Sequence, residues 1–356
     1  MLDGCFNSPP HKLQPLLNEA FETTRTHFSN VIYFSMPGMV HFDASFYRAT
    51  DPHRFPAVSV TGGRCSLNCE HCRKKILESM IPATTPESLV EVCTRIKEDG
   101  GKGCLISGGS LGDGSVPLMG FIPAIKRVKR ELGLDIVVHT GIVYPELAEA
   151  LAEADVDAAM IDVIGSDETL RSVYHLDLSV EAFDRSLSLL EQQGISLVPH
   201  VVVGIHYGKL KGEREALEII SKHKPKAVII VALMPLGQTP MEHATPPSPL
   251  DIARVILAAR FMIPKAPLIL GCARPGGEHK AKTDVLAIKA GVSGIAYPSE
   301  GGYSFAKKAG LNVRFSEECC ALIYRDLIKT RGPNRFPTGV EEGYNEEMEA
   351  SGPGSS

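Results

Sequence analysis

The sequence predicts an α/β fold, a (β/α)8 barrel of the TIM type with an N-terminal extension and a short C-terminal segment. Two observations lead to this prediction. Short β-branched runs alternate with amphipathic segments from about residue 57 to residue 300, the pattern of a parallel sheet with crossover helices. There are eight such runs, the number that closes a barrel of this type. A six-stranded open barrel is the alternative with the same alternation.

The eight predicted strands are short, apolar and followed by polar or glycine-containing segments. They are Ala57–Thr61, Gly103–Ser107, Asp135–Thr140, Ala158–Val163, Ser196–Val203, Ala227–Leu233, Leu268–Cys272 and Gly294–Tyr297. The amphipathic segments between them predict helices. These are Pro86–Glu98, Pro117–Glu131, Tyr144–Ala154, Val180–Gln193, Gly212–His223 and Pro249–Phe261. The first helix has a clear start, because Thr85 can cap it and Pro86 suits its first position.

The segments outside the strand–helix alternation differ from it in composition. Residues 1–56 predict a partly helical extension that ends in an aromatic-rich loop. The barrel itself is expected over residues 57–300. Residues 301–332 predict a segment that folds over the barrel mouth. Residues 333–356 are rich in Glu, Gly, Pro and Ser, a composition typical of a disordered tail.

Composition and charge exclude several classes of function. Hydrophobic residues make up 44% and charged residues 22%, as in ordinary soluble domains. The net charge of −5 gives no broad cationic surface, so a nucleic-acid partner is not expected. The first residues lack a signal-peptide pattern. The longest apolar run, Ala227–Leu236, is far shorter than the roughly 20 residues that span a bilayer. We therefore expect a cytoplasmic protein without a membrane partner.

The nine cysteines predict metal binding rather than disulfides, which are rare in the cytosol. Cys65, Cys69 and Cys72 follow the first predicted strand with C-x3-C-x2-C spacing. Three thiolates can hold three irons of a 4Fe–4S cubane and leave the fourth iron open to another ligand. The alternative is a zinc site with His71 as a further ligand, in a barrel that is a scaffold for partners rather than an enzyme.

This cysteine loop, placed after the first strand, resembles the signature of the radical S-adenosylmethionine (SAM) superfamily. The resemblance implies that SAM binds the open iron through its amino and carboxylate groups. An electron from the cluster, supplied by a donor such as ferredoxin or flavodoxin, then cleaves SAM to methionine and a 5′-deoxyadenosyl radical that takes a hydrogen from the substrate. His71 stands where the family often has an aromatic residue, and its flat ring can lie near the adenine.

The resemblance extends to the ends of later strands. Gly108, Gly109 and Ser110 resemble the Gly-Gly-Glu motif whose backbone contacts the SAM amino group, with Ser110 where Glu is usual. His139 and Asp162 end the third and fourth strands and are further candidates for binding the cofactor. Additional polar residues at strand ends, each with an alternative role in a turn or cap, are His200, Gln238 and Thr239.

Four of the remaining cysteines are candidate ligands of a second Fe–S cluster. They are Cys5, Cys272, Cys319 and Cys320. Cys272 ends the seventh strand, at the same face as the SAM cluster, and the adjacent Cys319 and Cys320 could fold back over it. Cys93 lies on the apolar face of its helix and Cys104 opens a strand, so both are expected in the core.

A narrower resemblance comes from segments near the sixth and seventh strands. Met234–Pro240 is similar to a Gly-Thr-Pro segment of biotin synthase, and Arg274 lies where that barrel holds its auxiliary cluster. Ala57–Gly62 before the cysteines, the Gly271–Gly277 segment and the late cysteine pair together most resemble a subunit of the two-component lipoyl synthases.

That resemblance implies sulfur insertion into an octanoyl chain on a lysine of a carrier or lipoyl domain. The sulfur would come from the auxiliary cluster, and a second radical SAM subunit would be the partner. The alternative is another biotin synthase-like or hydrogenase-cofactor-maturase-like enzyme that acts on a small free molecule.

Overall fold

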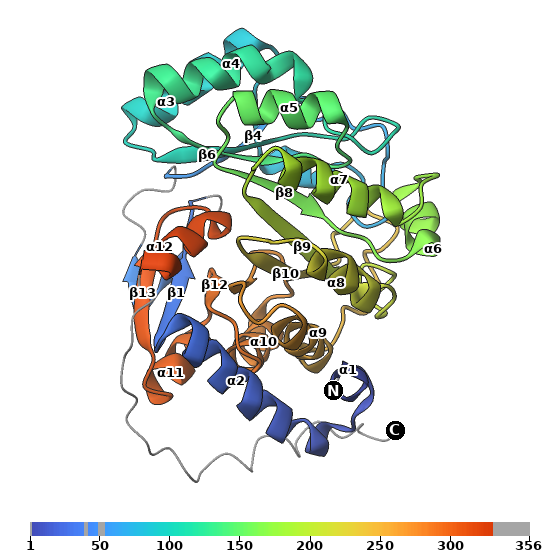
Figure 1. The fold of residues 1–356 in the computed structure, drawn as a ribbon, viewed down its shortest axis with the longest axis vertical. Coiled ribbons are helices and arrows are strands. Elements are labelled where there is room, and N and C mark those ends of the chain that lie inside the picture. Colours follow the sequence, from blue (N-terminus) through green and yellow to red (C-terminus); the bar gives the residue numbers. More distant parts are fainter. Residues whose placement is uncertain (1, 39–41, 49–53, 330–356) are drawn as a thin grey trace.

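The computed structural model describes residues 2–38, 42–48 and 54–329. Its main element is one curled sheet of eleven parallel strands, with helices packed around it (Figure 1). From edge to edge the strands are β13 (Asn312–Ser316), β1 (Val31–Ser35), β12 (Gly294–Ala296), β11 (Leu268–Leu270), β10 (Val228–Ala232), β9 (Leu197–Val203), β8 (Ala158–Asp162), β7 (Asp135–His139), β6 (Gly103–Ser107), β4 (Ala57–Ser59) and β5 (Ile81–Pro82). The predicted tail, residues 333–356, lies outside the described residues.

The predicted α/β barrel-type fold is confirmed, and all eight predicted strands are present as β4 and β6 to β12. The expectation that these eight strands close on themselves is wrong, because the outer neighbour of β12 is β1 rather than β4. β1 comes from the N-terminal extension and is buried along its whole length. Its β-branched and aromatic residues favour a strand, and the burial of its apolar side chains stabilises the pairing of β1 with β12.

The helices cover the outside of the sheet (Figure 1). They are α3 (Pro86–Glu98), α4 (Ile122–Arg127), α5 (Pro145–Glu153), α6 (Asp167–Thr169), α7 (Glu181–Gln192), α8 (Glu213–Ser221), α9 (Pro249–Met262), α10 (Gly277–Lys289) and α11 (Glu300–Lys308). The helix start predicted at Thr85 is confirmed, since Thr85 and Ser88 form a reciprocal capping box. No helix in the described part of the chain is long and apolar enough to cross a membrane.

The N-terminal extension adds helices as well as β1. Helices α1 (Leu2–Asn7) and α2 (Gln14–Phe28) both pack on α9. A hairpin of β2 (Asp43–Ala44) and β3 (Tyr47–Arg48) follows β1. The extension is therefore part of the barrel's outer layer and of its sheet.

The segment predicted at residues 301–332 contains most of α11 and all of β13, an edge strand of the sheet. After β13 the chain runs from the carboxyl end of the sheet toward its other end. A short turn at Cys320–Leu322 contacts both β8 and β12 and leads into α12 (Ile323–Lys329). The Tyr324 hydroxyl donates to the Asp157 carbonyl, and Arg325 pairs with Asp135 and Asp157 at the amino ends of β7 and β8. The residues directly after β13 thus lie at the carboxyl end, where the barrel mouth was predicted, whereas α12 lies at the amino end.

Candidate active site at the carboxyl ends of the strands

The three-cysteine loop begins at the carboxyl end of β4 and is fastened to the loop that follows β6. The Ser66 amide donates to the Ser110 carbonyl at 2.8 Å, and the Gly109 amide donates to the Thr61 hydroxyl at 2.7 Å. Cys69 and Cys72 are buried and Cys65 is half-buried. Two adjacent strand ends thus hold the loop in one position.

Gly108 and Gly109 make this close contact possible. A Cβ atom on Gly109 would lie 2.0 Å from the Arg64 carbonyl oxygen and 2.5 Å from the Cys65 Cβ. A Cβ on Gly108 would lie 2.9 Å from the Thr61 hydroxyl. Real Cβ atoms do not approach backbone atoms as closely as at Gly109, so that position requires glycine, whereas a Cβ at Gly108 would require the Thr61 side chain to shift. The structure places the Gly-Gly segment directly against the cysteine loop.

Cys69, His71 and Cys72 bring their ligand atoms within 4.8 Å of one another. A hydrogen bond from Cys69 lowers the pKa of the Cys72 thiol, and His71 lowers it further, whereas burial raises it. The net result is a pKa of about 4. The hydrogen bond with Cys72 and burial raise the pKa of Cys69, so the two neighbouring thiols differ in acidity. Cys65 belongs to the same loop, four residues before Cys69. The thiolate is the form that binds metal, and the acidic thiol of Cys72 favours it. The three thiols fit a three-thiolate cubane, and Cys69, His71 and Cys72 also fit a zinc ion.

A second polar group lies at the ends of β7 and β8 and in the middle of β9, where His200 pairs in register with Asp162. His139, Asp162 and His200 have ligand atoms within 4.8 Å of one another, and the His139 Nε2–Asp162 Oδ1 distance is 3.3 Å. Burial lowers the pKa of His200 to about 4, so this ring is neutral at pH 7. Burial opposes the ionisation of Asp162, but the His139 charge outweighs it and lowers the pKa of that carboxyl. The His71 charge acts on Asp162 too, which places this group beside the cysteine loop.

This group unites His139 and Asp162, which strand-end position predicted, with His200. Sequence reasoning placed His200 only among the further strand-end candidates. Its Nδ1 is buried and has no hydrogen-bond partner among the described residues. A buried unpaired nitrogen costs free energy in a native protein and commonly marks a place where a ligand binds. The arrangement can donate and accept hydrogen bonds toward hydroxyl or amino groups of a bound molecule.

Gln238 and Thr239, the other strand-end candidates, belong to the loop after β10. The Thr239 hydroxyl donates to the Leu236 carbonyl at 2.7 Å, which is the turn role. The Gln238 Oε1 accepts a 2.8 Å hydrogen bond from Lys75 Nζ. Lys75 follows the cysteine loop, so this contact joins loops from β4 and β10, which are far apart in the sheet order.

Cys272, Cys319 and Cys320 form the second set of thiols. Cys272 follows β11, and Cys319 follows β13. The pKa of Cys272 is raised by desolvation and then by the Cys319 charge, and Cys272 in turn acts on Cys320. The side chain of Cys272 is accessible to solvent, whereas Cys319 and Cys320 are buried. Cys272 and Cys319 thus follow two strands whose carboxyl ends lie at one end of the sheet, but among the described residues the three thiols do not form a group with ligand atoms within 4.8 Å of one another.

The other cysteines lie elsewhere. Cys5, which was predicted with this second set, is in α1, and its carbonyl accepts a hydrogen bond from Arg254 on α9. It is buried in the outer helical layer, and burial raises its pKa to about 11. Cys93 and Cys104 lie in the core between α3 and β6, with their sulfurs 3.8 Å apart. The structure does not bring these three to the other thiols.

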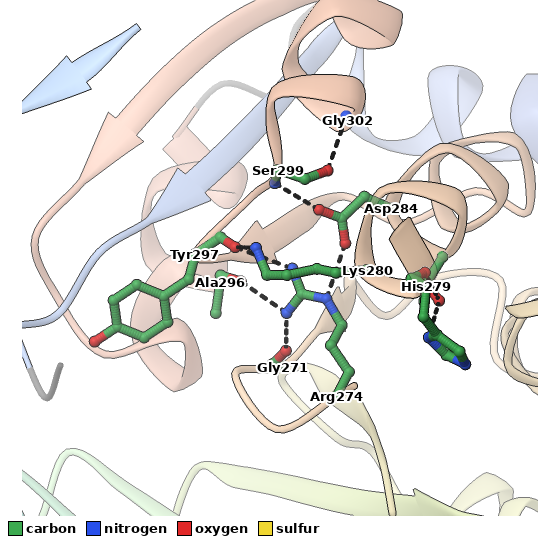
Figure 2. A network of polar contacts seen from close by, with 10 residues as sticks. Gly271, Arg274, His279, Lys280, Asp284, Ala296, Tyr297, Ser299 and Gly302 are labelled. Carbon is green, nitrogen blue, oxygen red and sulfur yellow. Dashed lines mark hydrogen bonds and ion pairs between the residues drawn. The ribbon is translucent and has the colours of Figure 1, made fainter. Parts of the chain in front are cut away.

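Arg274 is committed to structural contacts (Figure 2). Its Nε donates to Asp284 Oδ1 at 2.8 Å, and neither side chain is exposed. Its remaining donors reach three carbonyl groups at the ends of β11 and β12, those of Gly271, Ala296 and Tyr297. Asp284 Oδ2 accepts from the Ser299 amide at 2.6 Å. The guanidinium therefore joins two strand ends and α10 instead of facing a cofactor.

Replacing Arg274 with Met is expected to destabilise the protein by about 3–5 kcal/mol, because the buried Asp284 carboxylate loses its ion-pair partner. Anaerobic urea unfolding followed by circular dichroism measures the change. Lys282→Met, on the helix α10 that also carries Asp284, is the control. The Lys282–Glu278 ion pair is mostly exposed, so its loss changes the free energy of unfolding little. A loss of stability for Arg274→Met no larger than in the control would contradict the structural role.

Comparison with known proteins identifies two families along the chain. Residues 59–234 match the Radical SAM superfamily, and residues 230–340 match the Biotin and Thiamin Synthesis associated domain. The biotin synthase of Synechococcus elongatus is 29% identical over 253 residues, which cover 67% of this chain and 76% of the relative. The biotin synthase of Halorhodospira halophila is 25% identical over 296 residues, 80% of this chain and 81% of the relative.

Solved structures share the fold. Methylornithine synthase (PylB) superposes with a TM-score of 0.61 at 16% identity, over 92% of this chain and 95% of that protein. HydG, a maturase of the FeFe hydrogenase, superposes with a TM-score of 0.64 at 15% identity, over 91% of this chain and 73% of that protein. The three-thiol loop at the end of β4 lies inside the matched superfamily segment. Residues 59–234 therefore form a radical SAM domain that carries the three-thiol loop, and the chain as a whole is biotin synthase-like.

Proposed function

We propose that this radical SAM enzyme inserts sulfur at an unactivated carbon of an octanoyl chain carried on a lysine of a carrier protein. The observation that carries the proposal is the presence of two separate sets of thiols at one end of the barrel. β4, β11 and β13 belong to one parallel sheet, so the segments that follow them meet at its carboxyl edge. Cys65, Cys69 and Cys72 lie there, and so do Cys272 and Cys319.

Each set has a separate role in the proposal. Cys65, Cys69 and Cys72 would hold the 4Fe–4S cluster, and Gly109 would keep their loop in place. His139, Asp162 and His200 would hydrogen-bond SAM. When bound, the cluster and SAM supply the one-electron chemistry that removes a hydrogen atom from a carbon too inert for a side-chain base.

The second set of thiols would hold the source of the sulfur in this proposal. Cys272, Cys319 and Cys320 would hold an auxiliary Fe–S cluster, from which the sulfur comes. Such a cluster must face the carbon radical closely, because orientation and proximity decide whether the two react. Its position at the same barrel end as the SAM cluster suits that demand.

Sulfur insertion is supported by the names of the relatives, which are biotin synthases. Those names also favour a second candidate, in which a small free molecule is the substrate. The octanoyl chain is supported by the resemblance of Ala57–Gly62, Gly271–Gly277 and the late cysteine pair to a lipoyl synthase subunit, and by exposed apolar side chains in two connecting segments after β4 and β10. Ile76 is 54% exposed and Met234 is 44% exposed. An electron donor such as ferredoxin or flavodoxin and a second radical SAM subunit complete the proposal.

Iron analysis tests the auxiliary cluster. The anaerobically reconstituted Cys65/Cys69/Cys72→Ala variant is expected to keep about four irons per chain, those of a second cubane. Adding Cys272→Ser, Cys319→Ser and Cys320→Ser is expected to remove them, whereas adding Cys5→Ser is expected to leave them in place. Residual iron near zero in the folded triple variant would rule out the second cluster and with it the sulfur source.

The substrate is tested by incubating the reconstituted enzyme with SAM, a reductant and either an octanoyl-lysine peptide or dethiobiotin. A mass increase from sulfur on the peptide, with or without an added second subunit, supports the carrier-bound chain. Sulfur on dethiobiotin alone supports the small-molecule candidate. 5′-Deoxyadenosine without a sulfur product from either compound would show that the enzyme acts on a different substrate.

A further inference from the structure

The turn between β8 and α7 has an unusual backbone. Residues Leu170–Tyr174 form a single π-helical turn that follows α6. His175 then has a φ of 59°, in the left-handed region that residues other than glycine rarely adopt. Both features are rare and are held in place only by surrounding contacts, which often gather at functional sites.

Those contacts go to the cysteine loop. The Glu70 amide donates to the Val173 carbonyl at 2.9 Å, and the Cys69 thiol lies 3.9 Å from the Tyr174 carbonyl. His175 Nε2 lies 2.9 Å from a Glu70 carboxylate oxygen, which is also 3.1 Å from Arg73. Three consecutive residues of the turn, 173–175, therefore touch two consecutive residues of the loop.

The Tyr174 side chain adds a ring contact. Its ring centroid lies 5.3 Å from that of His71, with the two planes tilted by 54°, a favourable edge-type geometry. Tyr174 therefore contacts the cysteine loop through its ring as well as through its carbonyl oxygen.

His71 needs such a neighbour. Its Nδ1 is buried and has no hydrogen-bond partner among the described residues, so no hydrogen bond at that atom fixes the ring plane. The ring of Tyr174 packs against it and restricts how it can turn. His71 directly precedes Cys72. The orientation of its ring plane therefore determines how a planar group, such as the adenine of SAM, can approach the metal-binding thiols.

We infer that Tyr174 is a positioning residue, whose ring fixes His71 and whose turn holds Glu70 and Cys69, so that the cluster loop presents SAM with one preformed surface. The inference rests on the radical SAM cluster but not on the substrate. The inference predicts that SAM binding requires an aromatic ring at position 174 but does not require the Tyr174 hydroxyl.

The experiment compares Tyr174→Leu with Tyr174→Phe in the reconstituted full chain. Iron content, the dissociation constant for SAM and the electron paramagnetic resonance spectrum of the reduced cluster with and without SAM are measured, with no acyl substrate present. Tyr207→Leu is the matched control. It removes another His–Tyr ring pair, with centroids 5.4 Å apart, and a contact from Tyr207 to the turn at Ser172, but no contact to the cysteine loop.

Tyr174→Leu is expected to keep its iron, to bind SAM about tenfold more weakly and to lose part of the SAM-induced spectral change, as the loss of an aromatic pair implies. Tyr174→Phe and Tyr207→Leu are expected to stay within about twofold of the wild type. If Tyr174→Leu loses iron, retention of iron by Tyr174→Phe still supports the inference. Equal behaviour of the Leu and Phe variants, whether both are normal or both defective, would overturn it. A wild-type chain without a SAM-binding cluster would instead refute the function proposed above.

Discussion

Replacing Cys65, Cys69 and Cys72 together with Ala is expected to abolish the reductive cleavage of SAM to 5′-deoxyadenosine. The expected loss is complete, because no other described residue in the loop offers a thiolate to iron and soft thiolates are the ligands that Fe–S clusters require. Chromatography of anaerobic reactions with SAM and a strong reductant measures the product. Cys72→Ala alone is expected to have nearly the same effect, since a cubane held by three thiolates of this loop would lose one of its three protein ligands.

Two controls accompany this prediction. Cys5→Ala removes a thiol buried in the outer helical layer and is expected to leave cleavage unchanged. Metal analysis of the wild type distinguishes an iron–sulfur cluster from the alternative zinc site. A zinc ion held by Cys69, His71 and Cys72 would give one zinc and no iron in this loop. Cleavage of SAM that persists in the triple variant would contradict the assignment of this loop as the cluster site.

The strands of the barrel were predictable because each is a short apolar run followed by a polar segment, a local signal. β1 has the same local signal at Val31–Phe34, but its partners β12 and β13 are more than 250 residues away. Composition does not reveal a pairing at that separation. The extension was therefore predicted without its strand, and the barrel was predicted to close between the wrong neighbours.

The site divides in a similar way. The cysteine loop, Gly109 and Asp162 were predictable, because motif spacing and strand ends are visible in the sequence. Tyr174 was not, since it lies in an irregular turn that is distinguished by its backbone angles and by its contacts with Cys69, Glu70 and His71, none of which a sequence pattern reveals. Arg274 was predicted near the auxiliary cluster because it follows a strand at the active end of the barrel. The structure shows that it mainly binds backbone carbonyl groups, and a sequence does not reveal which carbonyl groups a side chain will reach.

Changing Gly109 to Ala is expected to cost at least about 100-fold in SAM cleavage, because it displaces the cysteine loop and a misplacement of about 1 Å has effects of this size. The sequence alone suggested that a side chain here would meet SAM. The structure shows that the added Cβ would instead meet the Arg64 carbonyl oxygen at 2.0 Å and the Cys65 Cβ at 2.5 Å. Neither atom is the end of a flexible side chain, so the backbone on one side must move.

The same loop offers the matched control. Gly63 has no atom within 4 Å of an added Cβ and does not have a positive φ, so Gly63→Ala tests the general effect of a methyl group in this loop. It is expected to keep iron content and SAM cleavage within about twofold of the wild type. Iron content and 5′-deoxyadenosine formation are measured for both variants after the same reconstitution. If Gly109→Ala behaved like Gly63→Ala, the β6 loop would not be what holds the cysteines in place. A Gly109→Ala protein that is folded but poor in iron would show that two adjacent strand ends, rather than the cysteine spacing alone, form the cluster site.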